Sequence, residues 1–416
     1  MLAAGALALT GCAAGAGSGS ADGRGDITIW YSNNEQEVAW GKQMVAAWNV
    51  DHPDEQVTGQ EIPAGKSSEE VIGAAITAGN AACLIYNTAP SAVGQFEKQG
   101  GLVDLSSLDG GAEYIQARTG ETAAQYENAD GDYFQMPWKS NPVVIFYNKD
   151  MFTAAGLDAE NPQLSTYDEF LATSKTLVDA GVAPNAILPA PTSEFFQSQF
   201  DFYPLYAAET GGKQIVEDNT ATFADEAGYD VADFWSTLYR DGLSSQEMYQ
   251  GDSFADGEAA MAIVGPWAVS VYEDVNWGAV PVPTKAGTAP ADTFTFSDAK
   301  NVGLYSACEN QATAWDVLKF STSEAQDGKL LELTGQMPLR TDLQTTYADY
   351  FAANPAYEMF GDQAARTVEV PPGPNTVEMM QVFRDAWSSA VIFGEGAVPT
   401  ALDDAASRIN DIAAKP

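Results

Sequence analysis

The sequence predicts an α/β fold made of two lobes. Short apolar segments alternate with segments of helical periodicity from Asp26 onward, which is typical of a mostly parallel sheet flanked by helices. Roughly 390 residues follow the N-terminal leader, too many for a single hydrophobic core. The alternation resumes after Gly131, so we expect the second lobe to repeat the architecture of the first.

The first lobe is predicted to open with a strand over 26–31 and a helix over 35–49. Further elements are expected as a strand over 56–62, a helix over 68–78 and a strand over 83–86. An extended apolar segment over 131–150 then leads to the second lobe, with helices over 166–180 and 230–239. In a sheet of this kind ligands bind near the C-terminal ends of the strands.

The N-terminus resembles a bacterial lipoprotein signal. A short apolar run ends in Leu9-Thr10-Gly11-Cys12, and a linker rich in Gly, Ser and Ala follows up to residue 25. Cys12 is therefore expected to carry the lipid and residues 13–25 to act as a flexible tether. No other run of the sequence is long and apolar enough to predict a membrane span. We expect the protein on the extracellular face of a bacterial cell membrane, held there only by the lipid.

Composition excludes several functions. A net charge of -39 repels nucleic acid, because binding it requires clustered Lys and Arg. The single histidine, His52, argues against a Ser-His-Asp triad and against a multi-histidine metal site. Two cysteines remain besides Cys12, which permits one disulfide but no cysteine-rich zinc site. We expect no metal and no cofactor.

Four segments, in this order, resemble the extracellular solute-binding family of carbohydrate ABC importers, the family of the maltose-binding protein. They are Gly131-Asp132-Tyr133-Phe134-Gln135-Met136-Pro137 with Val144-Ile145-Phe146-Tyr147-Asn148-Lys149-Asp150; Phe254-Ala255-Asp256-Gly257-Glu258-Ala259-Ala260-Met261 with Gly265-Pro266-Trp267; Trp277-Gly278-Ala279-Val280-Pro281-Val282-Pro283; and Ala314-Trp315-Asp316-Val317-Leu318-Lys319-Phe320 with Gly335-Gln336-Met337-Pro338-Leu339-Arg340. Together they extend the resemblance over nearly all of residues 26–416.

The resemblance implies two α/β lobes joined by a hinge that the chain crosses more than once. It places the N-lobe at 26–137 plus 282–330 and the C-lobe at 138–281 plus 331–416. It also implies that 301–306 returns as a strand antiparallel to 83–86, which would bring Cys308 beside Cys83. We therefore predict a disulfide between them, with two buried free thiols as the alternative.

A sugar site needs aromatic platforms for the apolar ring faces, and amides, carboxylates and a few cations for the hydroxyls. Trp267 matches the family's stacking tryptophan. Some of the other candidates have simpler explanations: residues 32–34 include a helix cap, the aromatic residues after 195 suit core packing, and a lone Lys or Arg suits the surface. The predicted ligand-binding residues are Tyr31, Asn33, Glu35, Lys66, Asn87, Trp138, Lys139, Phe196, Tyr203, Trp267, Phe296, Asp298 and Arg340.

The resemblance predicts a monomeric substrate-binding protein that captures an oligosaccharide in an aromatic-lined cleft and delivers it to the permease subunits of an ABC transporter. Two other functions compete with it. An enzyme such as a glycosidase or lyase with two carboxylates is disfavoured because no acidic pair stands out and no catalytic motif occurs, so we predict no enzyme. A binder of a cationic ligand, a polyamine or peptide, would suit the many Asp and Tyr residues but not a lysine in the cleft.

Overall fold

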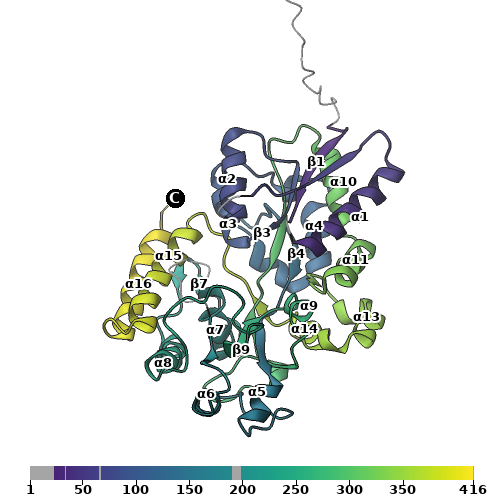
Figure 1. The fold of residues 1–416 in the computed structure, drawn as a ribbon. Helices are drawn as coiled ribbons and strands as arrows, with labels where there is room; N and C mark the ends of the chain where they lie inside the picture. The colour runs from purple at the N-terminus through teal and green to yellow at the C-terminus, as the bar shows by residue number, and fades with distance from the viewer. Residues whose placement is uncertain (1–22, 33, 65–66, 190–197, 416) are drawn as a thin grey trace, which may run out of the picture.

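The structure is a computed structural model that describes residues 23–32, 34–64, 67–189 and 198–415. Two lobes lie one above the other in Figure 1, each with helices around a central sheet. The predicted two-lobe α/β fold is confirmed. No helix in the described part of the chain is both long and apolar enough to cross a bilayer.

The N-lobe contains a mixed sheet of six strands in the order β13-β4-β12-β3-β1-β2. Its strands are β1 Ile27–Tyr31, β2 Val57–Glu61, β3 Leu84–Thr88, β4 Met136–Ser140, β12 Lys300–Leu304 and β13 Met337–Pro338. β1 pairs in parallel with β2 and β3, whereas β12, β4 and β13 pair antiparallel. The predicted return of 301–306 beside 83–86 is therefore confirmed.

The C-lobe contains a sheet of four strands in the order β10-β5-β9-β6. Its strands are β5 Val144–Asn148, β6 Asn185–Ile187, β9 Ala259–Val264 and β10 Trp277–Val280. Only β6 and β9 pair in parallel; β10, β5 and β9 are antiparallel neighbours. The expectation of mostly parallel sheets is wrong in this detail, because several strands enter each sheet from the other lobe or from distant segments instead of through a strand-helix-strand crossover.

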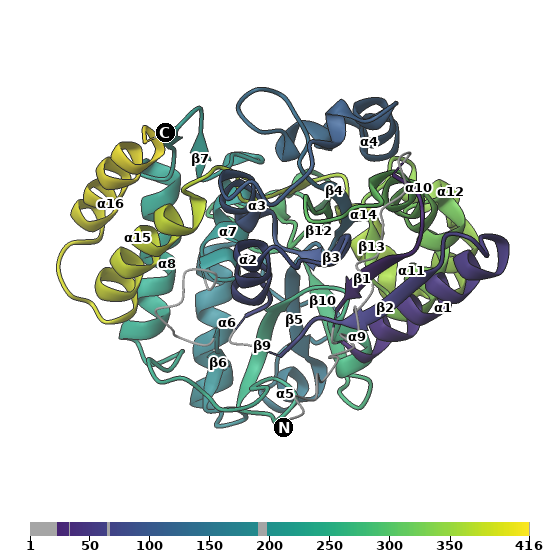
Figure 2. The same ribbon diagram turned by 90° about the horizontal axis from the view of Figure 1, so that it is seen from above.

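Helices cover both faces of the N-lobe sheet. Seen from above in Figure 2, α1, α10 and α11 lie together on one side of β1 and β3, and α2 and α3 lie on the other. Their bounds are α1 Glu35–Asp51, α2 Ser68–Ala78, α3 Pro90–Lys98, α4 Gly111–Thr119, α10 Gln311–Ser321 and α11 Glu324–Thr334. The side chains of α1 at helical spacing, among them Val38, Met44 and Trp48, are buried against this sheet as the periodicity predicts.

The C-lobe has a larger set of helices. α6 begins at a capping box formed by Thr166 and Glu169, which the local sequence predicts. The helices are α5 Lys149–Ala154, α6 Tyr167–Asp179, α7 Tyr203–Thr210, α8 Glu226–Arg240, α9 Ala268–Val271, α12 Leu343–Thr346, α13 Ala348–Ala353, α14 Glu358–Gln363, α15 Thr376–Trp387 and α16 Val398–Ala413. Their apolar side chains form two cores, one on each face of the sheet.

The chain passes between the lobes where short strands meet. β11 Thr295–Phe296 pairs with β14 Thr367–Val368, and the amide of Asn141 donates to the carbonyl of Ser297. Val282 and Phe296 belong to the C-lobe core, so the chain enters the N-lobe sheet closer to residue 298 than to the predicted 282. The predicted N-lobe segments end at 137 and 330. In the structure β4 continues to Ser140 and β13 lies at Met337–Pro338, and both strands belong to the N-lobe sheet.

Candidate functional site

A cavity of about 400 Å³ lies between the two lobes. Its lining comes from residues that follow β1 and lie in β3 on the N-lobe side, from the crossing segments, and from α9 on the C-lobe side. A hydrogen bond joins the two walls, from Gln36 Nε2 to Ser270 Oγ over 3.3 Å. The lining residues are Asn34, Glu35, Gln36, Glu37, Asn87, Lys139, Asn141, Trp267, Ser270, Val271, Asp298, Lys300 and Gln336.

The first turn of α1 brings polar side chains to this cavity. Asn34 caps the helix, and its side-chain oxygen accepts hydrogen bonds from the amides of Gln36 and Glu37 over 3.0 and 3.1 Å. The cap begins the helix immediately after β1. Glu35, Gln36 and Glu37 are thereby held at the cavity wall, where the positive end of the helix dipole favours acceptor groups.

Two lining residues have left-handed backbone conformations. Asn87 has φ 62° and Asp298 has φ 39°. Asn and Asp tolerate this region better than other non-glycine residues, and such conformations concentrate at functional sites. The side-chain oxygen of Asn87 is also buried, and no hydrogen-bond partner for it occurs in the part of the chain that the structure describes. The backbone conformation thus positions the side-chain amide of Asn87 at the cavity, where its oxygen is an unpaired acceptor.

A buried ionic network forms the floor of the cavity. Lys139 Nζ donates to Glu37 Oε1 and to Gln336 Oε1, each over 2.6 Å, and Gln336 Nε2 donates to Glu37 Oε1 over 2.8 Å. Asn141 adds a bond to Gln336 Oε1 over 3.1 Å. Burial alone would raise the pKa of Glu37, but the ammonium of Lys139 and these hydrogen bonds hold it below its usual value. Glu37 is therefore ionised at neutral pH.

This network does not satisfy all of its own polar atoms. Glu37 Oε2 and Asn141 Oδ1 are buried and have no hydrogen-bond partner among the described residues. A buried acceptor left without a partner costs about 1–3 kcal/mol. Together with Asn87 Oδ1, these atoms form a set of buried acceptors on residues that line the cavity.

Trp267 supplies an aromatic face on the opposite wall. It follows β9 through Gly265-Pro266 and precedes α9. The ring lies so close to Gly265 that a Cβ there would stand 2.1 Å from it, so only glycine allows this ring position. The ring of Phe200 packs edge-on against it with centroids 6.4 Å apart. Trp267 is thus held in a fixed orientation while remaining half-buried at the cavity.

Residues 32–328 match the family described as bacterial extracellular solute-binding protein. The chain belongs to this family. Among curated relatives, the maltodextrin-binding protein MdxE of Bacillus subtilis is 23% identical over 354 residues, covering 80% of this chain and 78% of MdxE. The sn-glycerol-3-phosphate-binding periplasmic protein UgpB of Rhizobium meliloti is 24% identical over 302 residues, covering 69% of each chain.

Solved structures share the fold of this solute-binding protein. The cyclic alpha-maltosyl-1,6-maltose binding protein of Arthrobacter globiformis superposes with a TM-score of 0.78 at 20% identity, covering 94% of this chain and 99% of that one. The GacH receptor of Streptomyces glaucescens superposes with a TM-score of 0.76 at 20% identity, covering 94% and 98%. At this level of identity the similarity establishes the two-lobe architecture.

The structure brings five of the predicted site residues together in the solute-binding protein. Glu35, Asn87, Lys139, Trp267 and Asp298 all line the interlobe cavity. Four predicted positions, Cys12, Asn33, Lys66 and Phe196, lie outside the described residues.

The other predicted aromatic residues that the structure describes lie in the lobe cores, so the expectation of an aromatic-lined cleft is wrong for these four. The ring of Tyr31 lies against the backbone of Gly41 and Gly59. Trp138 packs between other rings, 5.0 Å from Trp40 and 5.3 Å from Tyr86 between centroids. Tyr203 and Phe296 pack on each other with centroids 5.5 Å apart, and neither is more than 1% exposed. Burial of these large rings stabilises the lobes.

Arg340 also has a structural position. Its guanidinium bonds to Asp327 over 3.1 Å, and the same carboxylate is held by buried Arg118 over 2.9 Å. Asp327 is completely buried and needs both cations to offset its desolvation. Arg340 therefore belongs to an ion-pair network of the N-lobe and does not line the cavity.

Several lining residues were missed by sequence reasoning, namely Asn34, Gln36, Glu37, Asn141, Ser270, Val271, Lys300 and Gln336. Glu37 is one of 58 acidic residues, and nothing in its neighbourhood distinguishes it. Lys300 and Gln336 meet the cavity only because the strands beside them return from distant segments. Asn34, as a recognisable helix cap after the first strand, had the clearest local signal.

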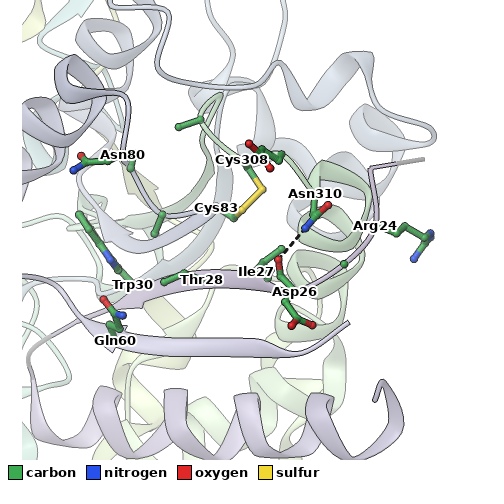
Figure 3. Close-up of a pocket in the computed structure, with 15 residues that line it drawn as sticks. Arg24, Asp26, Ile27, Thr28, Trp30, Gln60, Asn80, Cys83, Cys308 and Asn310 are labelled. Atoms are coloured by element: carbon green, nitrogen blue, oxygen red, sulfur yellow. Dashed lines mark hydrogen bonds between the residues drawn. A yellow bond between two sulfur atoms is a disulfide. The ribbon is translucent and has the colours of Figure 1, made fainter. Parts of the chain in front are cut away.

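A second cavity lies elsewhere on the N-lobe, beside the disulfide (Figure 3). Cys83 and Cys308 form this bond with a sulfur-sulfur distance of 2.01 Å, in the pairing that the resemblance implied. The cavity measures about 670 Å³, and Trp30, Gln60 and Asn80 project into it from the face of β1 and its neighbours. We refer to it as the disulfide groove. All of its lining residues belong to one lobe; they come from the segments just before β1 and β3, from β1 and β2 themselves, and from the segment after β12.

Proposed function

We propose that this solute-binding protein is the substrate-binding subunit of an ABC importer, anchored through a lipid on Cys12 to the outer face of a bacterial cell membrane. It captures an oligosaccharide between its lobes and delivers it to the permease subunits as a monomer. The observation that carries the proposal is the interlobe cavity, in which unpaired acceptors of one lobe face the half-buried ring of Trp267 on the other.

The chemistry of the lining suits a carbohydrate. A sugar ring offers an apolar C–H face, which packs on an aromatic ring, and hydroxyls that both donate and accept. Trp267 supplies the ring, and Glu37, Asn87 and Asn141 supply acceptors without partners. A cavity of about 400 Å³ falls in the range of small-molecule sites.

The relatives support this ligand class. MdxE is named a maltodextrin-binding protein, and the Arthrobacter structure is named a cyclic alpha-maltosyl-1,6-maltose binding protein. None of the relatives named above is described as binding a polyamine or a cationic peptide. Oligosaccharide capture is therefore favoured over the cationic alternative.

The geometry supports capture without chemistry. Gln36 of the N-lobe and Ser270 of the C-lobe meet across the cavity, and Ser270 Oγ also donates to the carbonyl of Trp267 over 3.1 Å. Contacts of this kind form only when the lobes approach, so a ligand that binds both walls shifts the protein toward the closed state. The closed state is the form that a permease would recognise. Binding energy here serves retention and delivery of an unaltered sugar.

Calorimetric titration tests the proposal. The protein is titrated with maltose, maltotriose, maltotetraose, spermidine and a lysine tripeptide, and each sugar is recovered afterwards by chromatography. We expect tight binding of at least one sugar, no product, and a loss of about 2 kcal/mol or more of binding free energy in Trp267→Ala. Trp30→Ala, in the disulfide groove, is the matched control and should bind like the wild type.

Binding of spermidine or the peptide with no response to any sugar would refute the oligosaccharide assignment. Recovery of a cleaved sugar would refute the assignment as a non-enzymatic binding protein. Equal losses in the two tryptophan variants would show that the sugar does not bind against Trp267.

A further inference from the structure

Both lysines that line the described part of the cavity are paired with carboxylates. Lys139 Nζ lies 2.6 Å from Glu37 Oε1, and its side chain is 1% exposed. Lys300 Nζ lies 2.6 Å from Asp298 Oδ1, with side chains 24% and 13% exposed. Each ammonium is thus neutralised inside the protein before any ligand arrives.

Among the described residues, the balance of charge at the cavity is negative. Glu35 adds a third carboxylate to the lining, and no cationic partner of Glu35 is found within this part of the chain. The chain as a whole has a net charge of -39, and its field opposes the approach of any anion. Partial burial acts against the charge of Lys300, but Asp298 outweighs it and raises the pKa of Lys300, so this lysine keeps its proton and its partner.

We propose that the cavity selects uncharged polyhydroxylated ligands against their phosphorylated or carboxylated analogues, and that Asp298 and Glu37 are the residues that enforce this selection. The inference rests on the proposed function, because it concerns the same cavity. The relatives are named for two kinds of ligand, the uncharged maltodextrin and the anionic sn-glycerol 3-phosphate. The inference goes beyond the proposed function by stating that this chain accepts the uncharged kind and excludes the anionic kind.

The physical basis is the cost of an unpaired charge. A phosphate entering this cavity would have to take a lysine from its carboxylate and leave that carboxylate next to another anion. A hydroxyl meets no such penalty, because it can donate to a carboxylate oxygen that remains paired with its lysine. The same arrangement therefore accepts a neutral sugar and excludes its anionic analogue.

Asp298→Asn is the variant that tests this selection. The substitution frees Lys300, and asparagine tolerates the left-handed backbone at φ 39°. Asp218→Asn is the matched control, because Asp218 also has a left-handed backbone, at φ 48°, but is exposed between β7 Val216–Glu217 and β8 Thr220–Ala221. Both variants and the wild type are titrated with maltose, maltotriose, glucose, glucose 6-phosphate, sn-glycerol 3-phosphate and inorganic phosphate.

In the wild type we expect a neutral sugar to bind at least a hundredfold more tightly than any of the phosphates. Asp298→Asn should reduce that ratio of affinities at least tenfold, because the variant gains affinity for a phosphate. The gain should become smaller as salt is added, since salt screens the attraction between the freed ammonium and the anion. Asp218→Asn should keep the wild-type ratio.

Wild-type binding of a phosphate as tight as that of the neutral sugar would overturn the inference, and so would an unchanged ratio in Asp298→Asn. In both cases oligosaccharide capture in the cavity would stand. A wild type that binds none of the neutral sugars would instead overturn the proposed function, and the inference with it.

Discussion

The interlobe cavity and the disulfide groove differ in construction more than in size. The groove is larger, about 670 Å³ against about 400 Å³, and it too contains a tryptophan and amides. Its lining, however, comes from one lobe. The interlobe cavity collects residues from both lobes, holds a buried ion pair and leaves buried acceptors unpaired. The proposal of the interlobe cavity as the ligand site therefore rests on residues from both lobes and on unpaired acceptors among them, and not on volume.

The largest contrast concerns the ion pairs of the two regions. Lys139→Met would leave Glu37 buried without a counter-ion, and we expect a loss of about 3–5 kcal/mol in the free energy of unfolding. Arg24, beside the disulfide groove, is 45% exposed where it pairs with Glu55, so Arg24→Met should lose about 1 kcal/mol or less. Urea unfolding of both variants measures the difference. Equal losses would show that the cavity network is no more structural than a surface pair.

Removal of the disulfide should separate stability from binding. The bond joins Cys83 to Cys308 across 225 residues of sequence, and Cys83→Ser combined with Cys308→Ser should lower the free energy of unfolding by about 2–5 kcal/mol. Sugar affinity at 25 °C should stay within about twofold of wild type, because neither cysteine lines the interlobe cavity. A comparable fall in affinity would mean that the groove side of the sheet helps to form the site.

A smaller change addresses the left-handed residue of the cavity. Asn87→Gly keeps the backbone conformation at φ 62° but removes the amide, so we expect the protein to remain folded and sugar affinity to fall about tenfold. Asn219→Gly, at φ 59° in an exposed turn, provides the control and should leave affinity unchanged. If both variants bind normally, Asn87 contacts no ligand.

The smallest predicted effect is a change of folding stability with pH, which arises from a carboxyl group buried behind the cavity. Glu369 is buried near the crossing segments, where its carboxylate accepts bonds from the amides of Ala299 and Val370 over 2.8 and 2.7 Å. Burial raises the pKa of Glu369 to about 8. The folded protein therefore holds this proton at pH values where the unfolded chain has lost it, and stability falls as the pH rises from about 5 toward 8.

Glu369→Gln removes this titration. Between pH 6 and pH 7 the unfolding free energy of the wild type should fall by roughly 1 kcal/mol more than that of the variant. Urea unfolding at a series of pH values measures it. A difference that does not change with pH would show that the buried carboxyl keeps one protonation state throughout this range.

Most of the secondary structure could be predicted from the sequence because periodicity and capping residues are local features of the chain. The helix predicted over 68–78 is α2 with the same bounds, and α1 and α6 were predicted from periodicity and capping residues. Sheet direction was less accessible, since the antiparallel strands of each sheet return from distant parts of the chain. Local patterns define elements but do not define which neighbours they acquire.

The site was predictable only in part, and β4 shows why. Trp138 and Lys139 are adjacent, so their side chains point to opposite faces of the sheet, and the sequence predicted both as ligand contacts. The structure turns Lys139 toward the cavity and Trp138 into the core. The partner of Lys139 lies 102 residues away at Glu37, and no pattern within the sequence connects the two.

A crystal structure of the protein with the sugar that binds most tightly in the titration tests the central claim most directly. We predict the sugar in the interlobe cavity, with one ring face on Trp267 and hydroxyls on the acceptors of Glu37, Asn87 and Asn141. A sugar seated instead in the disulfide groove, against Trp30, would contradict the account, because the larger cavity of a single lobe would then be the ligand site.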